Sequence, residues 1–323
     1  MIVFLILILS KINYQEFYYG LIQVKWHILL ILILLQVGSQ ALLNYQWFRL
    51  AKVVGLPLSF AKMLFINSQG SVVESITPGV KIGGEVTRAF YLSKILPCSS
   101  EEAGSVVALQ KIFSLSAFFL INLFSVLYLA DQVPFLRSLY IRVFIYGVLL
   151  TFLAIFAVAF WAPKQATEFL QCQKPAEAKL AKWFRNFLLI LFNYTDSLQK
   201  KRKESFLQFL LSMFIWVIYP IKMYILTVQF SLEINPVYIC AITFVSYMVA
   251  MVPIFPGGLG SFEATMSGLL LIAGLSIGEA SVISIVFRFI TFWFVFLASF
   301  GYAVGYKMFH NTKFDPQNGK ISL

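Results

Sequence analysis

Long apolar runs separated by short polar segments dominate the chain. A helix needs about 20 apolar residues to cross the roughly 30 Å of hydrocarbon in a bilayer. We therefore predict membrane-crossing helices over residues 26–48, 104–129, 140–161, 206–230 and 280–306. Two further apolar stretches are broken by Pro and Gly: residues 60–92 predict a re-entrant hairpin split at residues 78–84, and residues 236–273 predict a helix, a break and a half-helix.

The first nine residues are apolar but too few to cross a bilayer, since nine helical residues span only about 15 Å. Two readings compete for this segment, a short or truncated first helix and a signal peptide. No basic segment precedes the run, and no small-residue cleavage site follows it. We therefore expect a first helix that is short or has lost its start, in which case about ten more apolar residues lie upstream.

Composition identifies the class of protein. The chain is 60% hydrophobic and 12% charged, with a mean hydropathy of +0.83, which leaves too little polar surface for a soluble domain. The net charge of +11 comes mostly from short connections between apolar runs, which argues against nucleic-acid binding. Cys98, Cys172 and Cys240 are widely spaced, so neither a metal site nor a disulfide framework is indicated, and we expect no cofactor.

The distribution of basic residues predicts the orientation in the membrane. Residues 49–62, 164–203 and 307–320 hold fifteen Lys and Arg, whereas the connections around residues 11, 25, 137 and 142 hold four. The first set, with the C-terminus, should be cytoplasmic, in the cell (plasma or inner) membrane. The two breaks then open to opposite sides, so residues 1–323 are predicted to form one domain with inverted halves at about residues 26–162 and 205–309.

The basic connection over residues 163–205 leaves two readings open. Its mixed apolar and basic pattern fits a helix that lies on an anionic leaflet. The bias of positive charge toward the cytoplasm explains the same residues equally well. The segment is too short for a catalytic domain of its own.

One short element occurs twice in apolar surroundings. Ile76-Thr77-Pro78-Gly79 is followed by Glu85, and Ile254-Phe255-Pro256-Gly257 is followed at the same distance by Glu263. Breaks and carboxylates inside a bilayer cost free energy, because backbone groups and charge must be satisfied without bulk water. Chance pairing of a common turn dipeptide with a Glu is the alternative, but matched broken helices in two halves are typical of transporters.

The residues around the two breaks predict an anion site. If helices restart at about Glu85 and Ser261, their N-termini present free N–H groups and a positive dipole end, and phosphate is the obvious ligand. Glu85 and Arg88 can pair on one helical face, and Arg288 is the natural partner of Glu263. The glycines serve either backbone approach to a ligand or helix packing alone. The candidate substrate-binding residues are Pro78, Gly79, Gly83, Gly84, Glu85, Arg88, Lys111, Lys222, Pro256, Gly257, Gly258, Gly260, Glu263 and Arg288.

Several motifs together resemble a known family. They are Gly55-Leu56-Pro57-Leu58-Ser59 beyond Trp47, Thr77-Pro78-Gly79 through Gly83-Gly84-Glu85-Val86-Thr87-Arg88-Ala89, Pro253 through Glu263, and Arg288. Over nearly the whole chain they look like the transmembrane region of bacterial lysylphosphatidylglycerol synthases, the flippase-like domain family. The resemblance implies a stand-alone lipid transporter or an accessory protein, because no aminoacyl transferase domain is present. Two departures stand out: Gln110-Lys111 replaces the usual Glu-Arg, and an Asp that usually follows is missing, which leaves Lys111 without its usual partners.

The sequence therefore predicts an integral membrane lipid transporter that binds an anionic or phosphate-bearing head group between two broken-helix hairpins. A non-transporting subunit of a lipid or glycan-lipid enzyme is one alternative. An intramembrane phosphotransferase, with Glu85 or Glu263 as general base and Arg88 or Arg288 on phosphate, is another. Enzymatic chemistry has little support, since no catalytic constellation is visible in the sequence. The partners expected are membrane lipids, with a lipid-modifying enzyme under the accessory-subunit alternative, and not nucleic acid.

Overall fold

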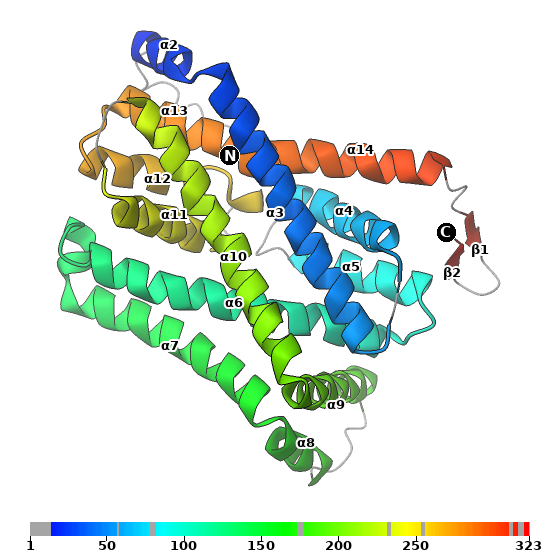
Figure 1. The fold of residues 1–323 in the computed structure, drawn as a ribbon. Coiled ribbons are helices and arrows are strands. Elements are labelled where there is room, and N and C mark those ends of the chain that lie inside the picture. The colour runs from blue at the N-terminus through cyan, green and yellow to red at the C-terminus, as the bar shows by residue number, and fades with distance from the viewer. Residues whose placement is uncertain are drawn as a thin grey trace.

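The computed structural model describes residues 14–56, 58–77, 82–172, 178–230, 234–252, 256–309, 313–315 and 320–322. The expectation for the first nine residues, and those for Pro78 and Gly79, lie outside the described residues. Within these ranges almost every residue is helical, and the helices form the bundle drawn in Figure 1.

Five helical segments are long and apolar enough to cross a membrane. Three are single helices, α3 (Trp26–Val53), α6 (Ser100–Leu129) and α7 (Leu139–Trp161). The fourth joins α10 (Arg202–Thr227) to the short 3-10 helix η2 (Val228–Phe230). The fifth runs through α13 (Ile277–Arg288), a π-helical turn η4 (Phe289–Trp293) and α14 (Phe294–Phe309). These segments confirm the five predicted spans, and the chain is a multi-pass membrane protein.

The two interrupted apolar stretches each form a pair of helices that pack against one another. The first pair is α4 (Phe60–Ile76) and α5 (Ile82–Ile95). The second is α11 (Pro236–Ala250) and α12 (Ser261–Ile272), with the 3-10 turn η3 (Pro256–Gly258) between them. Ser59 and Asn235 cap the first helix of each pair through their side chains. Each break therefore lies between two helices that are each shorter than a full crossing.

Shorter elements complete the fold. They are α2 (Tyr14–Gln23), the 3-10 helix η1 (Pro134–Arg137), α8 (Pro163–Cys172), α9 (Lys179–Lys200), and an antiparallel pair of strands, β1 (Lys313–Asp315) and β2 (Lys320–Ser322). The strand pair follows the last helix. Apart from these two short strands, the regular elements of the described residues are helical, as predicted from the sequence. The strand pair lies at one edge of the bundle in Figure 1, where β2 contacts α5.

The two helix pairs lie on opposite sides of the crossing helices α3 and α10. In Figure 1, α4 and α5 lie toward the strand pair, whereas α11 and α12 lie toward the opposite end, and α6 runs beneath both groups. Contacts join α6 to α5 and to α11, and α14 to α4. Buried aromatic residues fill the centre, where Phe118 of α6 packs between Trp216 of α10 and Phe244 of α11. This packing leaves the polar ends of both helix pairs near the middle of the bundle.

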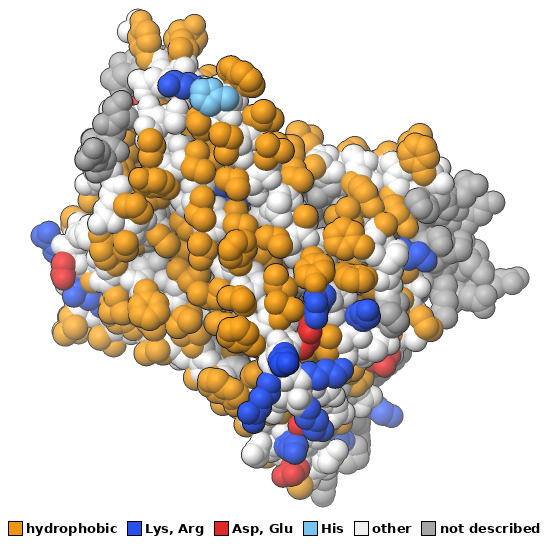
Figure 2. Space-filling view, viewed as in Figure 1, with side chains coloured by type: hydrophobic (Ala, Val, Ile, Leu, Met, Phe, Trp, Pro, Cys, Tyr) orange, Lys and Arg blue, Asp and Glu red, His pale blue; other side chains and the backbone are white. Residues whose placement is uncertain are grey.

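The basic connection contains a helix that packs on the bundle. Leu191 and Leu198 of α9 are buried in a cluster with Leu109 and Phe113 of α6. The apolar face of α9 therefore covers α6, which neither reading of the sequence foresaw. Figure 2 shows the resulting surface: orange side chains cover the crossing helices, and Lys and Arg gather at the end where α9 and α10 meet.

Candidate functional site

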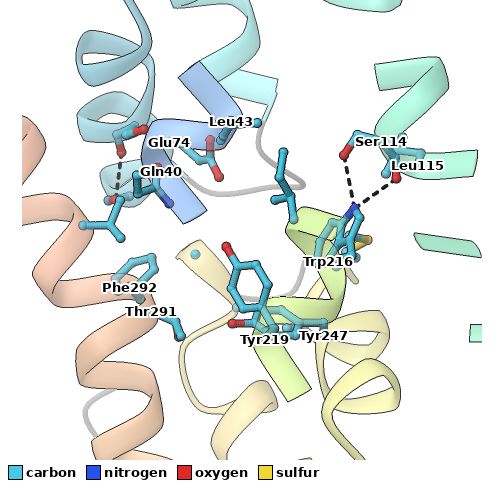
Figure 3. A pocket seen from close by; sticks show the side chains of 18 of the residues that line it. Gln40, Leu43, Glu74, Ser114, Leu115, Trp216, Tyr219, Tyr247, Thr291 and Phe292 are labelled. Atoms are coloured by element: carbon cyan, nitrogen blue, oxygen red, sulfur yellow. Dashed lines mark hydrogen bonds between the residues drawn. The ribbon is translucent and has the colours of Figure 1, made fainter. Parts of the chain in front are cut away.

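Side chains from both halves of the chain line a cavity of about 180 Å³ at the centre of the bundle. Figure 3 shows Gln40 and Leu43 of α3, Glu74 of α4, Ser114 and Leu115 of α6, Trp216 and Tyr219 of α10, Tyr247 of α11, and Thr291 and Phe292 of η4 around it. The cations Arg88, Lys111 and Arg288 also line the cavity. Ionised groups at this depth are costly and mark a site in most membrane proteins.

Arg88 lies at the centre of a charged cluster beside the first break. Its guanidinium is 2.8 Å from Glu85 on the preceding turn of α5 and 3.3 Å from Glu74 near the end of α4. The pairing with Glu85 confirms the expectation from their spacing. Arg88 also donates to the Ser71 hydroxyl at 3.4 Å, and it lies 5.8 Å from the Trp47 ring centroid. Two carboxylates therefore hold a cation whose residue is only 5% exposed.

Lys111 does have an ion partner. Its ammonium group lies 2.6 Å from Glu85, so one carboxylate joins the cation of α6 to that of α5. The family resemblance implied a Lys111 without its usual partners, and the structure supplies Glu85 in their place. Because Glu85 pairs with two cations, replacing it would leave both positive charges less well neutralised.

Small residues let α4 and α5 approach closely around this cluster. A Cβ on Gly84 would stand 2.8 Å from the Gly70 carbonyl oxygen, and a Cβ on Gly83 would clash with Thr77. A Cβ on Gly70 would stand 2.7 Å from Arg88 Nε, so Gly70 makes room for the arginine. Gly83 and Gly84 contact α4 and are not part of the cavity lining. The geometry thus gives these two glycines a packing role.

The second break is built from glycines with positive φ. Gly257, Gly258 and Gly260 have φ of 59°, 68° and 87°, a region that other residues enter only at a cost. A Cβ on Gly258 would stand 2.7 Å from the Ala250 carbonyl oxygen. Pro256 begins η3, and Gly257 and Gly258 line the cavity. The break therefore brings bare backbone to the cavity, which fits one of the two roles that the sequence left open for these glycines.

The helix after this break is already capped. α12 begins at Ser261, as predicted, whereas α5 begins at Ile82, three residues before the expected Glu85. The Gly260 N–H donates to the Glu263 carboxylate at 2.7 Å. One amide that we expected to face a ligand is thus occupied in this structure, and Glu263 competes for it with any anion.

Arg288 joins the last spanning segment to the second break. Its guanidinium donates to the Gly257 carbonyl oxygen and lies 3.5 Å from Glu263, the partner predicted for it. The rings of Phe262 and Phe292 flank it at 4.9 and 4.4 Å. Aromatic faces and a carbonyl are favourable surroundings for a guanidinium in a poorly hydrated place. The side chain is therefore fixed in position.

The second break meets the end of α4 at the cavity. η3 contacts α4, and a Cβ on Gly257 would stand 3.8 Å from the Ser75 carbonyl oxygen near the end of α4. Arg88 and Arg288, each 5% exposed, reach the same cavity from the two sides. The Nε atom of each is buried and has no hydrogen-bond partner among the residues that the structure describes, although Arg288 Nε lies 3.5 Å from Glu263. A buried donor without a hydrogen bond is costly, so both guanidinium groups have capacity to bind a ligand or water, Arg288 in exchange for its contact with Glu263.

Lys222 lies apart from this lining. The side chain is fully buried in α10, where it donates to Gln36 of α3 and lies 4.1 Å from the Tyr219 ring centroid. Tyr219 itself lines the cavity, so its ring borders both the cavity and the ammonium group. The expectation that Lys222 contacts substrate directly stays a prediction.

Sequence reasoning missed part of the site. Glu74 could have been predicted from the sequence, because it is a carboxylate near the end of an apolar helix, four residues before Pro78. Gly70 and the aromatic wall of Trp47, Trp216 and Tyr247 look like ordinary core residues in the sequence. Their role follows only from helix packing.

The chemistry of the cavity is that of charged donors, carboxylates and aromatic faces. Within the described ranges, no group of three or more His, Cys, Asp or Glu side chains is placed to hold a metal ion. Arginine and lysine around a small cavity, with exchangeable carboxylate partners, can bind a phosphate or another oxyanion through charge-assisted hydrogen bonds.

Comparisons with known proteins agree with the motifs. A UPF0104 membrane protein of Methanothermobacter thermautotrophicus is 20% identical over 285 residues, which cover 82% of this chain and 81% of the relative. UPF0104 membrane proteins of Methanocaldococcus jannaschii (21% identical, 81% and 80% covered) and Pyrococcus horikoshii (24%, 82% and 83%) are similar over comparable lengths. The sequence profile of the lysylphosphatidylglycerol synthase transmembrane region matches residues 1–299. With both breaks and both arginines inside that match, the chain belongs to the lysylphosphatidylglycerol synthase transmembrane-region family.

Proposed function

We propose that this protein is a lipid transporter that binds a phosphate-bearing head group in the central cavity and assists its movement across the bilayer. One observation carries the proposal. Arg88 and Arg288 come from different halves of the chain, are both buried, and line one cavity where η3 meets the end of α4. A phosphate that leaves the head-group region loses hydration, and preplaced cations and donors can replace it.

The charges of the site suggest how a ligand enters. Arg88, Lys111 and Arg288 are balanced by Glu74, Glu85 and Glu263, three cations against three carboxylates. Without ligand the carboxylates hold the cations in place and keep the cavity neutral. When a phosphate binds, it takes over donors from these carboxylates, which are each 16 to 20% exposed and can face water. Pairs that exchange partners avoid the cost of a bare buried charge.

We also propose that the two helix pairs are re-entrant hairpins of inverted halves. Their positions on opposite sides of α3 and α10, with the end of α4 and η3 both at the central cavity, support this arrangement (Figure 1). The basic end formed by Arg49, Lys52 and Lys201 supports a cytoplasmic location for α9 and for the C-terminus, in the plasma membrane. In this arrangement the first hairpin carries Arg88 on α5, and the second hairpin contacts Arg288 through Gly257.

Reconstitution tests the function. Purified protein is placed in phosphatidylcholine vesicles that contain radiolabelled phosphatidylglycerol, and phospholipase is added outside to measure how fast the inner-leaflet label becomes accessible. We expect faster exchange than in protein-free vesicles, and its loss in Arg88→Gln. The matched control is Arg142→Gln, because Arg142 pairs with the exposed Asp131 far from the cavity.

The outcomes separate the alternatives. Wild-type exchange rates in Arg88→Gln would refute the site. Transfer or hydrolysis of the head group without added phospholipase would indicate an enzyme. Absence of both exchange and chemistry in the wild-type vesicles would favour an accessory subunit.

A further inference from the structure

A second cavity adjoins the central one. It has a volume of about 250 Å³ and lies between α3, α4 and α14, with Val37 and Ala41 on one wall and Ala298 on the other. These three residues are exposed and belong to membrane-crossing segments. The mouth of this side cavity therefore faces the hydrocarbon of the bilayer and not water.

The two cavities adjoin one another. Gln40, Leu43, Ser71, Arg88 and Val295 line both of them. A molecule bound to Arg88 thus lies next to the cavity that leads to the lipid between α3 and α14. The buried arginine stands at the inner end of this side cavity, and exposed apolar or small residues stand at its outer end.

One face of α4 changes in polarity along its length. Phe60 and Leu64 lie at one end, Asn67, Ser68 and Ser71 follow on the same face at spacings of three or four residues, and Glu74 beside Arg88 comes last. The face thus offers apolar contacts, then amide and hydroxyl groups, and then charge. These are the kinds of contact that the acyl chain, the ester and glycerol region and the phosphate of a phospholipid require.

We propose that the side cavity is the binding site for an acyl chain of the transported phospholipid, whose phosphate lies at Arg88. This inference rests on the proposed function and deepens it. The lipid keeps its tail in the bilayer between α3 and α14 while its head group occupies the central cavity. Because the acyl chain stays in apolar surroundings, the protein needs to shield only the head group during transfer. This lowers the free energy of each step of the movement.

Filling the side cavity tests the proposal. Ala298→Trp and Ala41→Trp place a large ring at opposite walls of the mouth. The matched controls are Leu297→Trp and Leu34→Trp, because Leu297 and Leu34 are 57% and 62% exposed on the same two helices and do not line the side cavity. In the phospholipase assay we expect exchange to be slower by about tenfold or more in the two alanine variants and unchanged in the controls.

A binding measurement separates this proposal from the transport proposal. Native mass spectrometry of protein purified after addition of phosphatidylglycerol should show bound lipid in wild type and in the controls, and its loss in Ala298→Trp. Unchanged exchange and unchanged lipid binding in both alanine variants would overturn the side-cavity assignment. If wild type exchanges no lipid, the transport proposal fails. The side cavity is then judged by mass spectrometry alone, and retained lipid in Ala298→Trp refutes it. Equal thermal stability of the variants checks their folding.

Discussion

Arg288 donates a hydrogen bond to the backbone carbonyl of Gly257. The last crossing segment is thus tied to the second break by a cation that also lines the cavity. A single guanidinium therefore orders the backbone of the break and offers a donor to a ligand.

Arg288→Lys should harm both stability and transport. A lysine keeps the charge but cannot donate to Gly257 and also face Glu263 with a planar group between two phenylalanine rings. We expect the free energy of unfolding to fall by about 1.5–3 kcal/mol, the usual range for a hydrogen bond to a charged group, and lipid exchange to fall with it. Thermal unfolding in detergent and the vesicle assay measure the two effects. Arg49→Lys is the control, because Arg49 pairs with Glu204 away from the cavity, and equal losses in both variants would contradict this role of Arg288.

Glu85 should be more important for stability than a single ion pair suggests. It lies 2.8 Å from Arg88 and 2.6 Å from Lys111, so Glu85→Gln leaves two cations close together. We expect a loss of about 1–3 kcal/mol, reduced from the value for a fully buried pair because Lys111 is partly exposed. Adding Lys111→Gln should restore part of the loss.

A double-mutant cycle over these two positions measures the coupling. Wild type, both single variants and the double variant are unfolded thermally under one condition. If the losses of unfolding free energy in the two single variants simply add in the double variant, Glu85 and Lys111 do not interact.

Gly257→Ala should be destabilising through backbone conformation and space together. The φ of 59° costs a residue with a Cβ about 1–2 kcal/mol, and that Cβ would stand 2.7 Å from the Phe292 ring. Gly301→Ala is the control, because a Cβ there meets nothing within 4 Å. It lies inside helix α14 and should gain roughly 0.5–1 kcal/mol. Differential scanning fluorimetry should show shifts of opposite sign, and a stable Gly257→Ala protein would refute the strained break.

Cysteine labelling checks the orientation. In a variant without Cys98, Cys172 and Cys240, we expect Lys313→Cys to be protected from an impermeant thiol reagent in intact cells. Asp131→Cys should be labelled, because Asp131 is 89% exposed in the turn between α6 and α7, on the predicted outer side. The reverse pattern would reject the cytoplasmic C-terminus and the assignment of sides to the two hairpins.

Much of the fold was predictable because lipid imposes simple rules. Length and hydropathy predicted the five crossing segments, whose ends differ from the structure by a few residues. The pairs Glu85–Arg88 and Glu263–Arg288 were predictable because a buried charge in a bilayer requires a partner.

What the sequence did not reveal depends on contacts between distant segments. The pairing of Lys111 with Glu85, the meeting of Gly257 with Ser75 and the packing of α9 on α6 need the positions of whole helices. Glu74 was missed for a different reason. The repeat that drew attention to Glu85 and Glu263 has no counterpart of Glu74, since Val252 stands at the same distance before Pro256.

The π-helical turn η4 sets the register of everything that follows it in the last segment. The Phe294 N–H bonds to the Phe289 carbonyl, five residues back, so the turn contains one residue more than an α-helical turn. One residue corresponds to about 100° of rotation around a helix axis. In an unbroken α-helix, Leu297 would take the angular position of Ala298, and Gly301 that of Tyr302. This inserted residue is therefore the reason that a methyl group, and not an isobutyl group, lines the side cavity opposite α3.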